Sequence, residues 1–245
     1  MDITHFYYFI ILSFIFFPVL GISLTNEFKK VRNYRALLYA MLFTDPVYIV
    51  WDSLSVTYHV WTFNKKYITG IMVYNLPVEE ILFFFVVPFS TFLIYESIDY
   101  IKNDSFISKT SRIKKIMFII AILFILNAIY FYSYIYMLLA SVFTAFIILL
   151  TLKIMPSLYR SSNYWLFIII MYIPFIVFDH FLTSLPVFTY GVHAIINIRI
   201  LSIPVEEFIY VYSLMNFYAL FYNIYKKRSN KDELKFIVNY PLRIK

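Results

Sequence analysis

Two pairs of adjacent glutamates stand where strongly apolar segments begin, a position from which they could move protons inside a membrane. Each pair ends a Pro-Val-Glu-Glu motif. We call the number of residues from Pro77 to Pro204, which separates the two motifs, the repeat offset. An aspartate precedes each pair at a matched distance. The six acids are Asp52, Glu79 and Glu80 in the first set and Asp179, Glu206 and Glu207 in the second. Acids at the edge of a bilayer are costly to bury, so the matched register predicts a duplicated unit with a working site between its halves.

Carboxyl groups of this kind could transfer protons to and from an apolar substrate. Burial disfavours the ionised form, and neighbouring carboxylates disfavour joint ionisation, so a protonated acid can stand beside an ionised one. Such a pair can serve as general acid and general base. Aromatic residues follow both motifs, among them Phe83, Phe84 and Tyr210. Aromatic faces stabilise cations by about 0.5–2 kcal/mol, so the combination suits proton-initiated carbocation chemistry on a lipid-soluble alkene.

The glutamates also have a purely structural interpretation. Proline is tolerated in the first turn of a helix, and the helix dipole stabilises acids there. This explains one motif but not two, each with an aspartate at a matched distance. Adjacent helical residues point about 100° apart, so one glutamate of each pair can face the helix bundle while the other orients it or faces the loop.

Two further groups of polar residues are less informative. Asp45 lies seven residues before Asp52, on the same helix face, and could be a hydrogen-bonded polar group within the core. The histidines lack metal-ligand spacing. The acids could bind a divalent cation, but nothing in their spacing demands it, and we predict no metal site.

The composition predicts an all-α integral membrane protein. Of 245 residues, 62% are hydrophobic and only 14% charged, more apolar surface than a soluble domain of this length can bury. The absence of cysteine excludes disulfides and thiol chemistry. A span needs about 17–25 apolar residues. The seven expected spans are 6–24, 35–52, 77–98, 116–132, 134–152, 164–180 and 205–224, with Ser133 at a tight turn between the fourth and fifth.

Charge predicts the orientation of these spans. With seven crossings, one side receives 18 of the 21 Lys and Arg residues, and only Lys65, Lys66 and Arg199 remain for the other. The positive-inside rule then places the N-terminus outside and the C-terminus in the cytoplasm of a multi-pass protein of the cell membrane. The first apolar run has no basic segment before it, so we expect a retained anchor rather than a cleaved signal.

The repeat offset also predicts the domain organisation. It maps the first three spans onto the last three, so that each half is a three-helix unit. The fourth span is an extra crossing, which makes the two units parallel. The expected parts are a first repeat at 1–100, a linker with the extra helix at 101–132, a second repeat at 133–226 and a basic tail at 227–245.

Two stretches of the chain resemble the lycopene cyclases of the heterodimeric and fused membrane type. Residues 51–96 read WDSLSVTYHVWTFNKKYITGIMVYNLPVEEILFFFVVPFSTFLIYE and are similar to the N-terminal half of that family. Residues 178–218 read FDHFLTSLPVFTYGVHAIINIRILSIPVEEFIYVYSLMNFY and are similar to its C-terminal half. The departures are small: Asn197 stands where glycine is common, and Asn223 where an acid is common.

The resemblance implies an enzyme that closes ionone rings at the ends of lycopene without net redox change. An acid of a Pro-Val-Glu-Glu motif would protonate the terminal double bond, and a carboxylate would remove a ring proton to give the β-ring. Trp61 and Tyr190 would join Phe83, Phe84 and Tyr210 around the substrate. No cofactor is expected, since no Gly-x-Gly-x-x-Gly loop is present. The expected partners are lycopene, the bilayer and other enzymes of carotenoid synthesis, and no nucleic acid.

Other functions remain open at the level of sequence. Within the family, a cyclase that acts on C50 carotenoids or makes ε- or γ-rings is the nearest alternative, because the ring type depends on where the base sits. An ion-coupled transporter would also use repeats and intramembrane acids. It would normally show glycine-interrupted helices, however, and this chain has three glycines.

Overall fold

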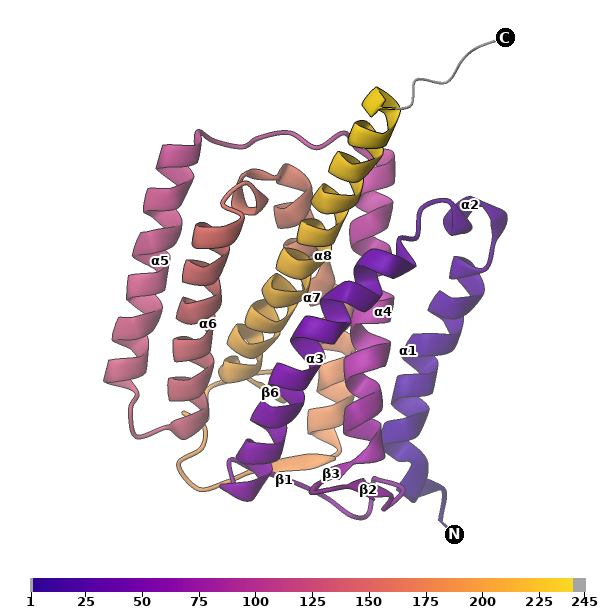
Figure 1. Cartoon of the computed structure of the whole chain (residues 1–245). Helices are drawn as coiled ribbons and strands as arrows, with labels where there is room; N and C mark the ends of the chain where they lie inside the picture. Colours follow the sequence, from indigo (N-terminus) through magenta and orange to yellow (C-terminus); the bar gives the residue numbers. More distant parts are fainter. Residues whose placement is uncertain (1, 240–245) are drawn as a thin grey trace.

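The structure is a computed structural model that describes residues 2–239. Within that range, seven long helices form a bundle (Figure 1). They are α1 (Tyr7–Ser23), α3 (Tyr34–Thr57), α4 (Val78–Ile101), α5 (Thr110–Tyr130), α6 (Ile135–Ile154), α7 (Ser162–Ser184) and α8 (Val205–Asn239). Short helical turns are η1 (Ile3–Phe6), α2 (Asn26–Lys29) and η2 (Leu158–Arg160). Each expected span coincides with one long helix, and α8 continues through the part of the predicted tail up to residue 239. Residues 240–245 of that tail lie outside the described residues.

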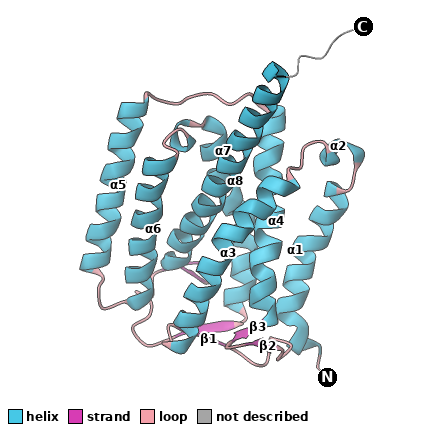
Figure 2. Cartoon of the chain, viewed as in Figure 1, coloured by secondary structure: helices cyan, strands magenta, loops and turns pink. Residues whose placement is uncertain are grey.

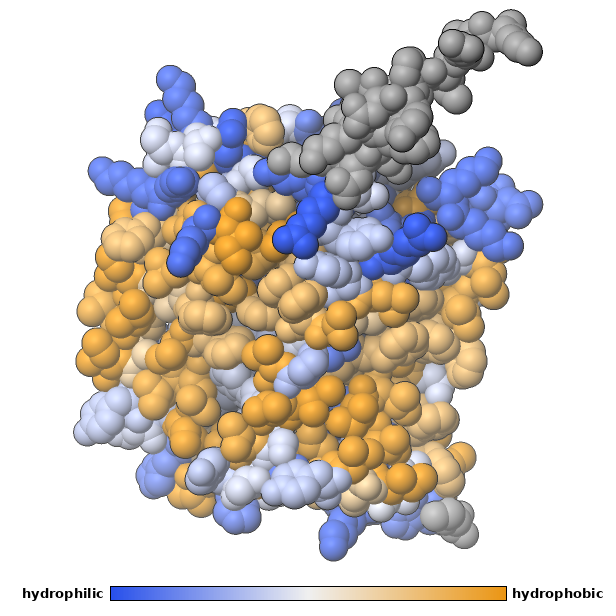
Figure 3. Space-filling view, in the orientation of Figure 1, coloured by the Kyte–Doolittle hydropathy of each residue, from blue (hydrophilic) through white to orange (hydrophobic). Residues whose placement is uncertain are grey.

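The surface of the bundle is typical of a membrane protein. Apolar side chains form a broad belt, and hydrophilic residues gather at its two ends (Figure 3). In the part of the chain that the structure describes, five helical segments are long and apolar enough to cross a membrane: η1 with α1, α4, α5, α6 and α7. The other two long helices, α3 and α8, fall short on composition and pack along one another. The helix positions therefore agree with the prediction, while the count of seven crossings stays a prediction.

The described residues are mostly helical, in agreement with the all-α prediction, and six short strands occur among them (Figure 2). The strands β2 (Met72–Val73) and β3 (Leu76–Pro77) form a hairpin before α4, and β5 (Arg199–Ile200) and β6 (Ile203–Pro204) form one before α8. The third sheet joins β1 (Trp61–Phe63) to β4 (Phe188–Tyr190). All three sheets lie at the end of the bundle where the chain starts (Figure 1).

Contacts at this end recur at the repeat offset. The antiparallel pair β1–β4 places Thr62 opposite Thr189, its counterpart in the other half, with the two hydroxyls 3.1 Å apart. Just before the hairpins, Gly70 and Asn197 occupy equivalent positions and both have positive φ, +83° and +64°. Asparagine tolerates this left-handed conformation better than most residues, which explains how Asn197 stands at the position that Gly70 occupies in the first half. The recurrence supports the predicted repeats.

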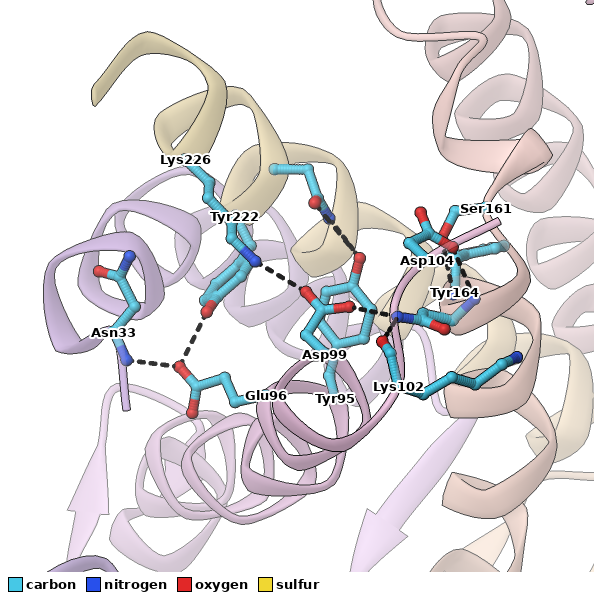
Figure 4. A network of polar contacts seen from close by, with 12 residues as sticks. Asn33, Tyr95, Glu96, Asp99, Lys102, Asp104, Ser161, Tyr164, Tyr222 and Lys226 are labelled. Carbon is cyan, nitrogen blue, oxygen red and sulfur yellow. Dashed lines mark hydrogen bonds and ion pairs between the residues drawn. The ribbon is translucent and has the colours of Figure 1, made fainter. Parts of the chain in front are cut away.

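The opposite end of the bundle is held by a polar network (Figure 4). Glu96 accepts hydrogen bonds from the backbone N–H of Asn33 and the hydroxyl of Tyr222, at 2.8 and 2.9 Å. Arg32 forms a salt bridge of 3.0 Å with the same carboxylate, and both side chains are almost fully buried. The network ties α4 to α8 and to the start of α3. Glu96 therefore has a structural role far from the glutamate pairs.

Candidate active site

Four of the six predicted acids line one small pocket near the strands. Its volume is about 50 Å³, and each acid comes from a different helix: Asp52 from α3, Glu80 from α4, Asp179 from α7 and Glu207 from α8. None of the four is more than 9% exposed. The remaining lining residues are Tyr8, Trp61, Phe63, Phe83, Tyr136, Leu182, Phe188 and Tyr210.

The other two acids, Glu79 and Glu206, bind the backbone beside the hairpins. Glu79 accepts a hydrogen bond of 2.7 Å from the N–H of Thr69, and Glu206 accepts one of 2.7 Å from the N–H of Ile196. Both glutamates have no exposed surface. Because α4 starts immediately after Pro77, the two glutamates of a pair fall on adjacent positions of the first turn and point in different directions. One then supports the loop while its neighbour faces the pocket.

The aspartates stand one turn inside their helices rather than at the ends. Helix α3 continues to Thr57 and α7 to Ser184, past the expected ends at Asp52 and Asp179. The extra turn lowers the aspartates into the bundle, to the depth of the first turns of α4 and α8. After α3 ends at Thr57, His59 has a φ of +54°, and the chain turns toward β1.

Tyrosine hydroxyls donate hydrogen bonds to three of the four pocket acids. Tyr8 donates to Glu80 at 2.8 Å, Tyr190 to Glu207 at 2.6 Å and Tyr210 to Asp52 at 3.3 Å. Burial and the nearby carboxylate of Glu207 raise the pKa of the Tyr190 hydroxyl well above its ordinary value, so this phenol remains a donor. Asp52 and Glu80 line the same pocket.

Asp179 differs from the other three acids. One of its carboxylate oxygens, Oδ2, is buried without a hydrogen-bond partner among the described residues. In the first half the equivalent acid, Asp52, has Tyr210 as a donor. At the position that corresponds to Tyr210 in the other half stands Phe83, which lacks a hydroxyl. Among the described residues, Asp179 is therefore the pocket acid whose carboxyl group receives the fewest hydrogen bonds from the protein.

The predicted aromatic residues fall into two groups. Trp61, Phe83 and Tyr210 line the pocket, and Tyr190 contacts it through Glu207. Phe84 is 1% exposed and faces the core, where it contacts Tyr48. It is not among the residues that line the pocket, so we leave it out of the proposed site.

Two tyrosines that line the pocket, Tyr8 and Tyr136, are not among the predicted site residues. They stand near the starts of α1 and α6, and their separation exceeds the repeat offset by one residue. A gapless comparison of the halves pairs Tyr8 with Ile135, so the correspondence is visible only if one residue is inserted between the motifs and the first helix.

An apolar groove of about 420 Å³ adjoins the pocket between α1, α4 and α7. It shares five lining residues with the pocket: Phe83, Asp179, Leu182, Glu207 and Tyr210. Asp52 and Glu80 do not line it. From the groove, the accessible acids are therefore Asp179 and Glu207.

Comparison with known protein families agrees with the geometry. The profile of the lycopene cyclase family matches residues 4–98 and 133–225, which contain the two sets of acids. Comparisons with curated proteins and with solved structures give no match. The matched residues make up more than half of the chain and form two segments, one in each half. The chain therefore belongs to the lycopene cyclase family.

Proposed function

We propose that the chain converts lycopene to γ- and β-carotene by closing a β-ionone ring at each end. The observation that carries this proposal is the meeting of four buried carboxyl groups, from four helices, in one pocket with aromatic walls. Family membership indicates a carotenoid cyclase, and the pocket offers the groups that such a cyclisation needs.

The reaction requires one proton to enter and one to leave. A carboxylic acid protonates the terminal double bond of lycopene, which leaves a tertiary cation. The next double bond along the chain attacks that cation, so a carbon–carbon bond closes the ring and the positive charge moves to a ring carbon. A carboxylate then takes a proton from the ring carbon that formed the new bond, and the β-ring double bond results. The product is an isomer of the substrate, and proton exchange with solvent restores both the acid and the base.

We assign the proton transfers to Asp52, Glu80, Asp179 and Glu207, and a positioning role to Glu79 and Glu206. This narrows the sequence prediction, in which all six acids belonged to the catalytic set. The hydrogen bonds from Thr69 and Ile196 hold the positioning glutamates against the hairpins. Aromatic rings of Trp61, Phe83 and Tyr210 border the pocket, where they can stabilise the cation.

The membrane arrangement is also part of the proposal. Seven crossings, with parallel repeats at 1–100 and 133–226, place the pocket near the outer face of the cell membrane and the C-terminus in the cytoplasm. The linker and extra helix occupy 101–132. The helices α1, α3 and α4 run in the same order of directions as α6, α7 and α8 (Figure 1), which supports parallel repeats. Lycopene enters from the bilayer, and no cofactor takes part.

The test is the pigment content of a lycopene-producing host that expresses the chain. The wild type is expected to yield γ- and β-carotene, and the double variant Glu80→Gln/Glu207→Gln to leave lycopene unchanged. Glu27→Gln, at an exposed glutamate of α2, is the matched control and is expected to behave as the wild type. Unchanged lycopene with inserted wild-type protein would overturn the proposal. Products with ε- or γ-rings, or conversion of a C50 carotenoid alone, would assign a different cyclase reaction.

A further inference from the structure

The apolar groove continues beyond the pocket along most of α4. A second groove of about 520 Å³, at the far end of the bundle, shares Leu93 and Ile94 with the first and extends to Ile101. From Phe83 to Ile101, at about 1.5 Å per residue, the two grooves together span roughly 27 Å. That is close to the thickness of the hydrocarbon core, roughly 30 Å. An extended acyclic C40 polyene is somewhat longer than this, so one such chain would occupy the full length of both grooves.

At the corresponding positions of the other half, aromatic side chains take the place of the residues that line the groove. Three groove residues of α4 are Ser90, Thr91 and Ile94. At the repeat offset, α8 carries Phe217, Tyr218 and Phe221 instead. All three are wholly or largely buried in the core.

These aromatic side chains pack against neighbouring rings. The ring of Phe217 lies 6.2 Å from that of Tyr48 and 5.2 Å from that of Phe221. Tyr218 donates a hydrogen bond of 2.6 Å to Asp45, which gives that deeper acid a structural partner. The two halves therefore differ: α4 lines an open groove, whereas α8 carries packed aromatic rings at the matching positions.

The open groove ends at a polar group without a partner among the described residues. Asp179 is only 9% exposed, lines both the groove and the pocket, and has one oxygen without a hydrogen bond. An unsatisfied buried polar atom is costly, so its retention at the end of an apolar channel points to a chemical role for this carboxyl group rather than a packing role. Glu207, its neighbour on the groove wall, already accepts a hydrogen bond from Tyr190.

We propose that one polyene lies lengthwise in the groove between α1, α4 and α7, with its reacting end at Asp179 and Glu207. This inference rests on the proposed function and adds two statements to it. The enzyme has a single substrate site, so the two ends of lycopene are cyclised one after the other, with release and reversal of the polyene between them. Asp179 donates the proton to the terminal double bond and Glu207 removes the ring proton.

The test uses a block placed at a defined depth. Ile94 lies at the junction of the two grooves, about 16 Å from Phe83 along the helix axis. Ile94→Trp is expected to slow cyclisation of lycopene at least tenfold. It should leave within threefold the cyclisation of an acyclic apocarotenoid of about half the length that keeps one intact lycopene end. The control is Val50→Phe, which adds bulk at an exposed position of α3 and should affect neither substrate.

A second variant keeps the test decisive if Ile94→Trp folds poorly. Ser97 lines the far groove, and Ser97→Trp should give the same loss for lycopene alone. Unchanged rates on lycopene in both variants would overturn the groove assignment, as would equal losses on the long and the short substrate. Failure of the proposed function would be distinct, since the wild type would then cyclise neither substrate.

Discussion

Replacement of the two neighbouring glutamates Glu206 and Glu207 by glutamine should separate chemistry from positioning. Glutamine keeps the shape of the side chain and its acceptor oxygen but cannot carry the transferable proton. Glu207 lines the pocket, whereas Glu206 binds the N–H of Ile196. The two substitutions are therefore chemically identical and one residue apart, and they differ in which face of α8 they alter.

The expected magnitudes differ accordingly. General acid–base catalysis contributes about 10²–10⁴-fold, so Glu207→Gln should raise the barrier by about 3–5 kcal/mol. Glu206→Gln exchanges a hydrogen bond to a charged acceptor, worth about 1.5–3 kcal/mol, for a neutral one worth about 0.5–1.5 kcal/mol. A loss of about 1–2 kcal/mol of stability corresponds to a decrease of about 2–8 °C in Tm. The cyclisation rate per folded Glu206→Gln protein should fall less than tenfold.

The assay measures both quantities on one preparation. Cyclisation of lycopene in proteoliposomes is followed by chromatography of the pigments, and thermal unfolding is followed in detergent. The homologous pair in the other half, Glu79→Gln and Glu80→Gln, repeats the comparison on the other glutamate pair of the same pocket. If Glu206→Gln reduced the rate as much as Glu207→Gln while its Tm stayed that of the wild type, the division of roles would be wrong.

Four further outcomes are expected. Asp179→Asn should reduce cyclisation at least tenfold more than Asp52→Asn, measured as rates in proteoliposomes; equal losses would contradict the working end assigned to the groove. Product formed in heavy water should gain one deuterium per ring, by mass spectrometry; none would exclude an exchangeable carboxylic acid as the donor. A reporter at the C-terminus that is active only in the cytoplasm should be active; activity of the opposite reporter would contradict seven crossings. Glu96→Gln, which leaves Arg32 buried without its counter-charge, should cost about 3–5 kcal/mol, seen as a lower Tm; an unchanged Tm would contradict it.

Much of the architecture could be predicted because it depends on local sequence. Each long helix coincides with an apolar run, since a span must satisfy its backbone within one segment. The break between α5 and α6 falls at the expected serine, Ser133, because two helices of ordinary length need a turn there. The meeting of Asp52 and Asp179 with Glu80 and Glu207 follows from their register at the same end of the helices.

The strands and the tyrosine donors could not be predicted in the same way. Strands of two or three residues, such as Met72–Val73, have too little sequence for a periodic pattern. Their pairing is fixed by the hairpins and by contact between the halves. Tyr8 reaches Glu80 from the start of α1, although the two residues are far apart in the chain. Such a contact depends on how α1 packs against α4, which no local pattern specifies.

The residues that distinguish the two halves can be read from the sequence, but their effect on the pocket and the groove cannot. Duplication explains why each half has an aspartate and a glutamate pair. Divergence then decided their use, because Tyr210 supports Asp52, whereas Phe83 leaves Asp179 without a donor. Helices α4 and α8 also differ at Ser90 and Phe217. Ser90 lines the open groove, whereas Phe217 packs against Tyr48. Both changes favour a single substrate site at Asp179, since this acid, which lacks a tyrosine donor, lies at the end of the open groove. A repeat that gave up one of its two sites can keep its acids beside the working ones, because Asp52 and Glu80 line the same pocket as Asp179 and Glu207.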